Sequence, residues 1–421
     1  MEINKLRELT EQIFLNTPEN IGVSIGHKTT NGINTGELSI VFLVDKKLPL
    51  LELSEDQTLP TTLEIENQII KTDVIEVGVF STYACNDQQL IDNGCYDWCN
   101  QNPNPPLNTN TTINNKRRQR PLVGGVSIKA NNSYNIIGTM GLIAKDTATG
   151  GYVGLTNAHS IIGDPFYTID RTSIIIIENE YNTIMLQSGE NAFFQQRDVI
   201  GETLRYQPLF KQPTLNYIDA ALIAINPDIV VNGQELDLTA STVGLQFAST
   251  NEINQLMTTY SGTEVISTSR TTGAKQGPCG LRVSNIGVSA TITNFRSQFN
   301  SNLSVNFADQ ILFTRVNPEC RWPVYPGDSG AVLIADFDGV YKIIGVVVGG
   351  NNDTVGIACR IDRISQNLSI SRWDGTLTDT YFNNDSKEII TVPAGSNQTT
   401  LVCSGQTYWQ IGNTTLDNQC Q

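Results

Sequence analysis

A serine in a glycine-rich turn is the first candidate for chemistry in this sequence. Ser329 lies in the run V-Y-P-G-D-S-G, directly before the apolar run Ala331–Ile334. The pattern predicts a tight turn that enters a buried strand. The N–H groups of Gly327 and Ser329 would then point at one place, where they could hold a developing oxyanion. We expect nucleophilic attack by the serine hydroxyl, although such a turn also occurs without a function.

A serine nucleophile needs a neighbouring base, and the chain has only two histidines, His27 and His159. His159 follows the strand-like run Tyr152–Thr156. It is therefore predicted at a strand end, where a side chain is both held by the sheet and accessible. A purely structural role is the alternative for His159. We interpret His27, which follows Gly26 at another strand end, as structural.

The third candidate is an aspartate that would orient the imidazole ring. Eight aspartates lie between His159 and Ser329. Asp219 directly precedes the apolar run Ala220–Ile225, whereas most of the others lie in polar or turn-like stretches. A carboxylate beside such a strand would be buried and would need a partner. We therefore predict that His159, Asp219 and Ser329 form a catalytic triad.

The elements that must position these residues are strands. Short apolar runs alternate with Gly, Asn and Asp from Pro121 to about residue 370, a pattern typical of all-β barrels and sandwiches. The predicted fold class is mainly β. With 421 residues the chain is too long for a single core. We predict four parts: a small α/β module at 1–82, a Cys-, Asn- and Pro-rich linker at 83–120, a β domain at 121–372 and a small β appendage at 373–421.

Three motifs resemble those of chymotrypsin-like serine proteases. T-N-A-H-S around His159 is similar to the family's T-A-A-H-C, and I-D-A-A-L around Asp219 is similar to D-I-A-L. G-D-S-G holds Ser329, and the order of the three motifs is that of the family. The resemblance covers roughly residues 121–370. It implies a chymotrypsin-like double β-barrel, two packed six-stranded barrels with the triad in the cleft between them.

Two further runs resemble parts of the same family. S-R-T-T-G at 269–273 is similar to the stretch that opens the second barrel in many bacterial relatives. G-V-V-V-G-G at 345–350 is similar to the strand that pairs with the substrate backbone, which implies Val348 and Gly350 as substrate-binding residues. A Val-rich run is also typical of a core strand. The N-terminal runs T-G-E-L and T-D-V-I-E-V-G resemble a bacterial trypsin-like peptidase group to which the plant narrow-leaf protease is also similar.

The sequence departs from the family at three positions. Ser160 follows the histidine in place of cysteine, so the usual disulfide there is absent. Pro323 stands six residues before the nucleophile, where trypsin-like enzymes carry an acidic residue. Pro121 follows Arg120 where the family's zymogens are cut, and proline makes a poor scissile bond. We interpret this last stretch as a first barrel strand that needs no processing.

Composition excludes several classes of function. The net charge of -15 repels phosphate backbones and anionic membranes, so we predict no nucleic-acid partner and no membrane partner. No apolar stretch approaches the ~20 residues of a membrane-spanning helix. The start of the chain lacks the apolar core of a secretory signal, which predicts a cytoplasmic protein, or a secreted one if a signal was removed.

The eight cysteines leave the compartment open, because an even number would also suit disulfides in an oxidising compartment. Cys95 and Cys99, with Cys85 upstream, raise the question of zinc, but a fourth ligand at the usual spacing is missing. We predict no metal and no cofactor. Cys403 and Cys420 could close a small loop.

The expected function is that of a trypsin-like serine endopeptidase acting on protein or peptide substrates through an acyl-enzyme. An oligomer is compatible with the sequence. The alternative is a non-catalytic protease-fold scaffold that binds partners through its terminal modules. Since none of the three triad residues is missing, we favour the enzyme.

Overall fold

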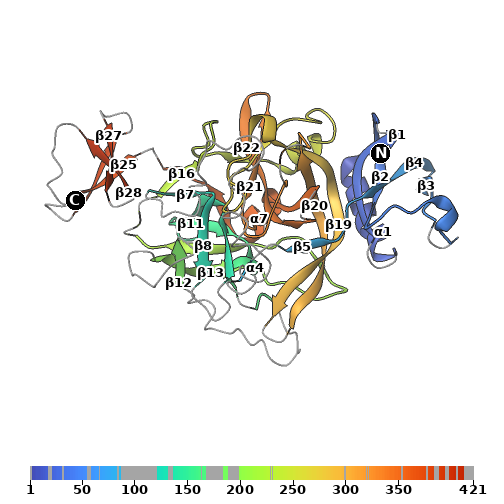
Figure 1. Cartoon of the computed structure of the whole chain (residues 1–421), viewed down its shortest axis with the longest axis horizontal. Helices are drawn as coiled ribbons and strands as arrows, with labels where there is room; N and C mark the ends of the chain where they lie inside the picture. Colours follow the sequence, from blue (N-terminus) through green and yellow to red (C-terminus); the bar gives the residue numbers. More distant parts are fainter. Residues whose placement is uncertain are drawn as a thin grey trace.

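The computed structural model of the chain consists mainly of β-strands, as predicted (Figure 1). It describes residues 2–82 except 18–20, 31–32, 55–57 and 66, residues 85–86, residues 121–375 except 131–135, 163, 167–183, 188–198, 228, 230, 298–299, 319, 321 and 352–353, and residues 378–383, 388–393, 398–403 and 406–411. Most described strands belong to two large sheets, one of nine strands and one of thirteen.

The first sheet contains the strands on either side of the predicted histidine. Its order is β24-β10-β11-β15-β13-β12-β8-β9-β6. Only Gly141 separates β9 from β10, so the sheet curls back toward its start. The bounds are β6 (Cys85–Asn86), β8 (Val126–Ala130), β9 (Ile136–Met140), β10 (Leu142–Asp146), β11 (Tyr152–Thr156), β12 (Ile184–Gln187), β13 (Val199–Tyr206), β15 (Ala221–Ile225) and β24 (Ile370–Arg372).

Six strands of the second sheet close a ring. β18 pairs with β19, β19 with β20, β20 with β23, β23 with β22, β22 with β21, and β21 with β18. This half therefore has the six-stranded barrel that the motifs predicted. The bounds are β18 (Val265–Ile266), β19 (Leu281–Ser297), β20 (Asn300–Arg315), β21 (Val332–Phe337), β22 (Val340–Gly350) and β23 (Val355–Arg360).

Shorter elements connect these strands. β7 and β16 pair with each other, β14 adds to β20, and β17 adds to β22. The short helix α7 directly follows β23. The bounds are β7 (Leu122–Gly124), α4 (Ala158–Ile161), β14 (Leu215–Asn216), β16 (Val231–Glu235), β17 (Gln246–Phe247), α6 (Thr250–Gln255), η5 (Gly277–Cys279) and α7 (Ile361–Asn367).

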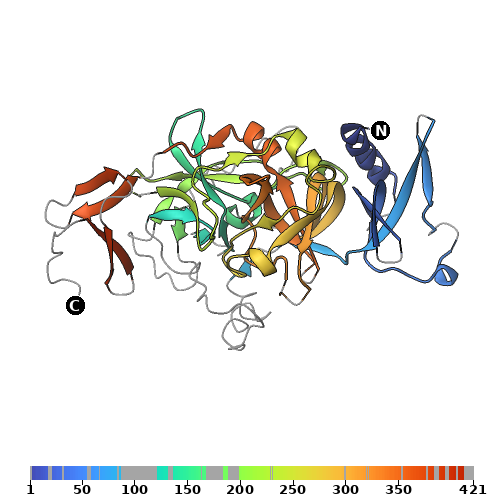
Figure 2. The ribbon, with the colours of Figure 1, turned by 90° about the horizontal axis from the view of Figure 1, so that it is seen from above.

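The N-terminal module joins the second barrel edge to edge. β1 pairs antiparallel with β19, so the order β19-β1-β2-β4-β3 continues the barrel sheet outward, in blue beside orange in Figure 2. The helix α1 buries Leu6 and Phe14. The bounds are α1 (Ile3–Leu15), β1 (Gly22–Thr30), β2 (Ile33–Val44), η1 (Leu50–Glu52), β3 (Thr62–Ile65), β4 (Gln68–Glu76) and β5 (Phe80–Thr82).

A buried carboxylate fixes α1 against the barrel. Asp309 of β20 is 1% exposed and accepts a hydrogen bond from Arg7 Nε at 2.7 Å. Arg360 and Arg363 contact the same carboxylate, at 3.0 and 2.6 Å. Since three guanidinium groups surround it, the buried charge is well compensated. The N-terminal helix is thus part of the packing of the second barrel.

The C-terminal strands form two separate hairpins at the end of the molecule opposite the N-terminal module (Figure 1). β25 (Thr378–Asn383) pairs with β26 (Glu388–Pro393), and β27 (Gln398–Cys403) pairs with β28 (Gln406–Ile411).

One disulfide lies among the described residues, between Cys279 at the end of η5, just before β19, and Cys320 after the end of β20. Cys359 is a free, buried thiol. The predicted loop closed by Cys403 and Cys420, and the zinc question at Cys95 and Cys99, lie outside the side chains that the structure describes. No helix within the described ranges is long and apolar enough to cross a membrane.

Candidate active site

Neighbouring strands of the first sheet bring His159 and Asp219 together. β11 pairs with β15, with Thr156 opposite Ala221. His159 lies in the one-turn helix α4 just after β11, and Asp219 lies two residues before β15. The pairing of the two strands therefore places these side chains at the same end of the sheet.

The imidazole of His159 lies between the Asp219 carboxylate and the Ser329 hydroxyl. Its Nδ1 contacts Asp219 Oδ2, and its Nε2 is 3.0 Å from Ser329 Oγ. The backbone N–H of His159 also donates to Asp219 Oδ1, at 3.1 Å. A proton on Nδ1 that is donated to the carboxylate leaves Nε2 as an acceptor for the serine hydroxyl. The structure thus brings the three predicted residues into hydrogen-bond contact, all of them buried.

Buried groups enclose the aspartate. Asn157 Nδ2 donates to the backbone carbonyl of Asp219 at 2.7 Å, and the Asp219 N–H donates to Cys359 Sγ at 3.2 Å. Burial, together with the nearby Asp219 charge, raises the pKa of the Cys359 thiol well above its usual value. The thiol therefore stays protonated and adds no negative charge. The ring of Phe295 packs edge-on against His159, with 5.5 Å between ring centroids.

Both sheets hold the turn that carries Ser329. From the second barrel, the N–H of Gly330 donates to the carbonyl of Val347 at 2.9 Å. From β9 of the first sheet, the N–H of Thr139 donates to the Ser329 carbonyl at 2.8 Å. The nucleophile candidate is therefore fixed at the junction of the two sheets.

The predicted oxyanion donors have the conformation that the turn requires. Gly327 has φ +96°, a region that favours glycine, and a Cβ there would come within 2.5 Å of Thr271 Oγ1. Thr139 Oγ1 donates to the Gly327 carbonyl at 2.8 Å, which fixes the orientation of that peptide. The N–H groups of Gly327 and Ser329 donate to no other residue that the structure describes. Within the part of the chain that the structure describes, both are therefore available to a substrate oxygen.

Asp328, between these two residues, holds the turn from behind. It is 2% exposed, and its Oδ1 accepts the backbone N–H groups of Thr271 and Thr272, at 2.9 and 3.1 Å. Its Oδ2 accepts the Thr272 hydroxyl at 2.8 Å and the Tyr325 N–H at 2.9 Å. Four donors satisfy the carboxylate without a free chain terminus. This agrees with the interpretation that no cut before Pro121 is needed.

A buried lysine supports the chain just before the turn. Lys275 Nζ donates to the backbone carbonyl of Trp322 at 2.6 Å. Burial lowers the pKa of Lys275 to about 8, although the Asp328 charge opposes this shift. The indole of Trp322 stacks on the ring of Tyr325, with 4.3 Å between centroids.

The predicted substrate-binding residues Val348 and Gly350 lie at the end of β22, beside the nucleophile. Ser329 Oγ is 3.0 Å from the Val348 carbonyl oxygen. Gly350 lies opposite Gly356 of β23 on one side of the strand and opposite β5 on the other. The outer edge of this strand is therefore already paired within the chain.

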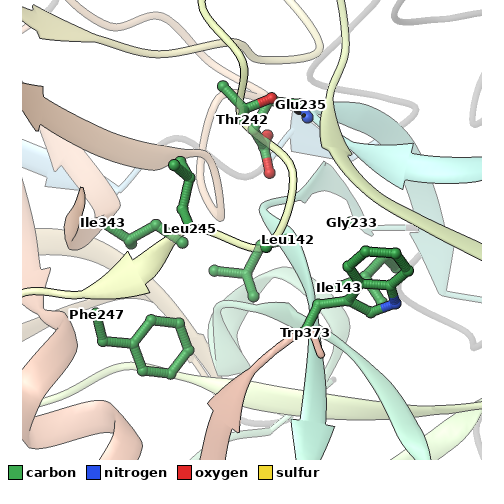
Figure 3. Close-up of a pocket in the computed structure, with 10 residues that line it drawn as sticks. Leu142, Ile143, Gly233, Glu235, Thr242, Leu245, Phe247, Ile343 and Trp373 are labelled. Carbon is green, nitrogen blue, oxygen red and sulfur yellow. Dashed lines mark hydrogen bonds between the residues drawn. The ribbon is translucent and has the colours of Figure 1, made fainter. Parts of the chain in front are cut away.

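The buried carboxyl of Glu235 lies apart from the triad, in a small cavity between β16 and the end of the β domain (Figure 3). The cavity has a volume of about 10 Å³ and contains no triad residue. Glu235 Oε2 has no hydrogen-bond partner among the described residues, and burial raises the pKa of Glu235 well above its usual value. The side chains drawn around it are mostly apolar: Leu142, Ile143, Leu245, Phe247, Ile343 and Trp373. A space for about one water does not suit a substrate.

Sequence reasoning missed the residues that hold the nucleophile turn. Thr271 and Thr272 had been recognised only as part of a run that resembles the start of the second barrel, and Thr139 had not been singled out. The only signal for Thr271 and Thr272 was their place in the run S-R-T-T-G. That run does not indicate that these threonines donate to Asp328. No cluster of three or more His, Cys, Asp or Glu side chains suited to a metal ion occurs in the described parts of the chain.

Comparison with known proteins finds likeness only among solved structures. No family model and no curated protein matches the chain. A Cellulomonas bogoriensis chymotrypsin has 14% identity and a TM-score of 0.36, covering 60% of this chain and 98% of its own. Thermobifida fusca protease A has 14% identity and a TM-score of 0.35, and a Nocardiopsis protease 13% and 0.35, with the same coverage. Likeness at this distance carries no conclusion about activity, and the similarity to the narrow-leaf protease group stays a prediction from motifs.

Proposed function

We propose that this protein is a serine endopeptidase that hydrolyses peptide bonds in protein or peptide substrates. One observation carries the proposal: Asp219, His159 and Ser329 form a continuous hydrogen-bonded series beside two backbone N–H groups that donate to none of the described residues. Acyl transfer needs a nucleophile, a base, a group that orients the base and donors for the oxyanion. All four kinds of group lie together at the junction of the two sheets.

In the proposed mechanism His159 Nε2 takes the proton of Ser329 as its Oγ attacks the substrate carbonyl. The N–H groups of Gly327 and Ser329 hold the oxygen that becomes negative. Asp219 orients the imidazole ring and stabilises the imidazolium. His159 then gives the proton to the leaving amine, and a water molecule hydrolyses the acyl-enzyme by the same route in reverse.

The position of Val348 suggests how substrate binding would direct the serine proton. Ser329 Oγ lies 3.0 Å from His159 Nε2 and 3.0 Å from the Val348 carbonyl oxygen. Because the hydroxyl has only one hydrogen, it can donate to only one of these two acceptors. A substrate N–H group that donates to the Val348 carbonyl oxygen would compete with the Ser329 hydroxyl for this acceptor. The serine proton would then be left to the imidazole, as attack requires.

The proposed enzyme lacks the acidic residue with which trypsin-like enzymes bind a basic substrate side chain. Pro323 and the buried Val324 occupy the stretch six and five residues before Ser329. Neither offers a carboxylate to a basic substrate side chain, so we propose no strong preference for Lys or Arg.

The compartment remains a proposal as well. The sequence predicted a cytoplasmic protein, whereas the disulfide between Cys279 and Cys320 is of a kind that persists in oxidising compartments. We therefore favour an oxidising compartment, and the thiol count of the protein isolated from its natural source would test this.

Labelling with a fluorophosphonate probe tests the enzyme proposal. The wild-type protein should be labelled on Ser329, and Ser329→Ala should lose the label together with any peptidase activity. Ser284→Ala is the matched control, because Ser284 only donates to a backbone carbonyl within the β19–β20 hairpin. A wild-type protein that neither reacts with the probe nor cleaves casein would favour the non-catalytic scaffold instead.

A further inference from the structure

The N-terminal helix α1 contacts the segment that carries Asp219. Glu11 of this helix accepts a hydrogen bond from the Tyr217 hydroxyl, with 2.8 Å between Glu11 Oε2 and the phenol oxygen. Burial raises the pKa of Glu11, and burial together with the Glu11 hydrogen bond raises the pKa of Tyr217 to about 12. Only Ile218 separates Tyr217 from Asp219, so this hydrogen bond fixes the chain two residues before the triad aspartate.

The second barrel holds the rest of Tyr217. The Arg363 guanidinium of α7 lies over the phenol ring, 4.4 Å from the ring centroid, at a distance typical of a cation–π contact. The buried side chain of Gln310, in β20, donates through Nε2 to the Tyr217 backbone carbonyl at 2.9 Å. The hydroxyl, ring and carbonyl of Tyr217 are thus each bound by a different element, α1, α7 and β20.

A second series of contacts leads from α1 to Asp219 through a buried ion pair. Arg7, one turn earlier in the helix, contacts the carboxylate of Asp309. Asp309 also accepts a hydrogen bond from Arg360 Nη1 at 3.0 Å. Arg360 directly follows Cys359, whose Sγ accepts the Asp219 N–H at 3.2 Å. The helix is therefore connected to the backbone of Asp219 itself, as well as to the residue two positions before it.

These contacts bear on the position of the Asp219 carboxylate. Its two oxygens accept two hydrogen bonds from His159, one from the backbone N–H and one from the ring. Hydrogen bonds weaken steeply when they are misaligned, so a small rotation of the chain at Asp219 would break one of the two. Residues 217–220 lie between β14 and β15 and belong to neither strand. Side-chain contacts must therefore hold this stretch in place.

We propose that Glu11 and Tyr217 are positioning residues of the triad, which act through Asp219. The inference rests on the proposed peptidase function, because an effect on rate requires a catalytic triad. Glu11 holds the Tyr217 hydroxyl, Tyr217 holds the chain, and the Asp219 carboxylate then meets both hydrogens of His159. The N-terminal module would thus contribute to turnover, and not only to the packing of the second barrel.

Tyr217→Phe tests the inference, because it removes only the hydroxyl. In the full-length protein, kcat with a peptide ester should fall about tenfold, whereas KM should change by less than about twofold, since neither residue contacts substrate. Glu11→Ala should give the same loss, and the double variant should lose no more than either single variant. Glu11→Gln keeps an acceptor oxygen for the hydroxyl, so kcat should stay within about twofold of wild type.

Two variants of the same helix separate positioning from stability. Glu8→Ala removes an exposed carboxylate that has no partner in the described parts of the chain, and it should behave as wild type. Thr10→Val removes the hydroxyl that donates to the Gly287 carbonyl of β19 at 2.9 Å. It should lower the midpoint of urea unfolding and leave kcat unchanged. An equal loss of kcat in Thr10→Val and Tyr217→Phe at equal stability would mean that α1 acts only through stability, which would overturn the inference.

A spectroscopic measurement tests the geometry without turnover. The proton that His159 Nδ1 donates to the buried Asp219 carboxylate should give a far-downfield proton NMR signal. Nitrogen-isotope labelling of histidine would assign this signal, because the chain has only two histidines. Tyr217→Phe and Glu11→Ala should lose the signal through exchange with water, while Glu8→Ala and Thr10→Val should keep it.

The outcomes separate this inference from the proposed function. A folded Tyr217→Phe variant with unchanged kcat and an unchanged signal would overturn the positioning role and leave the peptidase proposal standing. If the fluorophosphonate probe does not label the wild-type protein but Tyr217→Phe still loses the signal, the peptidase proposal falls and the positioning of Asp219 stands. No labelling, together with a signal that does not respond to Tyr217→Phe, would overturn both.

Discussion

The catalytic junction and the small cavity around Glu235 bury carboxyl groups in opposite ways. At the junction, Asp219 accepts from His159 through both side-chain oxygens, and Asp328 accepts from four donors. In the cavity, Glu235 Oε2 has no partner among the described residues, and burial raises the pKa of Glu235.

The difference follows from where the donors come from. A buried charge costs free energy unless hydrogen bonds or an opposite charge compensate for it. Two loops of the second sheet, one before β19 and one after β20, bring backbone N–H groups to Asp328, whereas β16 presents Glu235 to a mostly apolar cavity. We therefore expect the junction carboxylates to orient catalytic groups through these hydrogen bonds, and Glu235, whose pKa is raised by burial, to affect only stability.

The largest effect is expected for Asp219→Asn. An amide cannot hold the tautomer that leaves Nε2 free, so kcat should fall about 10⁴-fold, measured with a peptide ester substrate. Asp336→Asn is the matched control, because Asp336 accepts only from an exposed turn. A loss of less than about tenfold would show that Asp219 does not orient the base.

Asp328→Asn should have the next largest effect. An amide presents two hydrogens where the carboxylate accepts from Thr271, Thr272 and Tyr325, so the turn should shift and misplace the Gly327 N–H. We expect kcat to fall about 10²- to 10³-fold with a smaller change in KM. An unchanged kcat in a folded variant would mean that the turn keeps its shape without this carboxylate.

Lys275 is a buried basic residue near the nucleophile turn, and its ionisation should change stability with pH. The pKa of Lys275 is lowered to about 8 in the folded protein, so between about pH 8 and 10.5 the unfolded chain holds more protons. Stability should therefore rise with pH across this window, by roughly 1 to 3 kcal/mol. Lys275→Met should abolish the rise in denaturant titrations, while Lys71→Met, at an exposed site, should keep it.

Glu235→Gln should give the smallest effect. It should make the protein slightly more stable, whereas the Asp219 and Asp328 variants should lose activity. Because the folded-state pKa of Glu235 is raised, stability should be full below about pH 4.5 and should fall as the pH rises toward that raised pKa. Glutamine stays neutral, so the variant should be about 1 kcal/mol more stable than wild type at pH 8. Glu64→Gln, on an exposed strand, should not change the pH profile. Lower activity in Glu235→Gln would contradict the separation of the two regions.

The sequence by itself was sufficient for the mainly β class and for the three triad candidates. His159 is one of only two histidines in the chain, and Ser329 lies in a glycine-rich turn. The apolar strand that follows Asp219 distinguished it from the seven other aspartates between His159 and Ser329. These are local signals, since each depends on a residue and its near neighbours. The structure then placed all three side chains in contact.

Only the tertiary structure decided which distant segments surround them. Strand pairing put Thr82 opposite Gly349, and loop packing put Thr271 against Asp328, although neither pair is marked in the sequence. The closure of the second barrel likewise put Cys279 next to Cys320. Such contacts depend on the register and closure of whole sheets, to which many residues contribute weakly. For this reason the sequence could indicate a nucleophile, but not that the chain's own N-terminal strand lies in front of it.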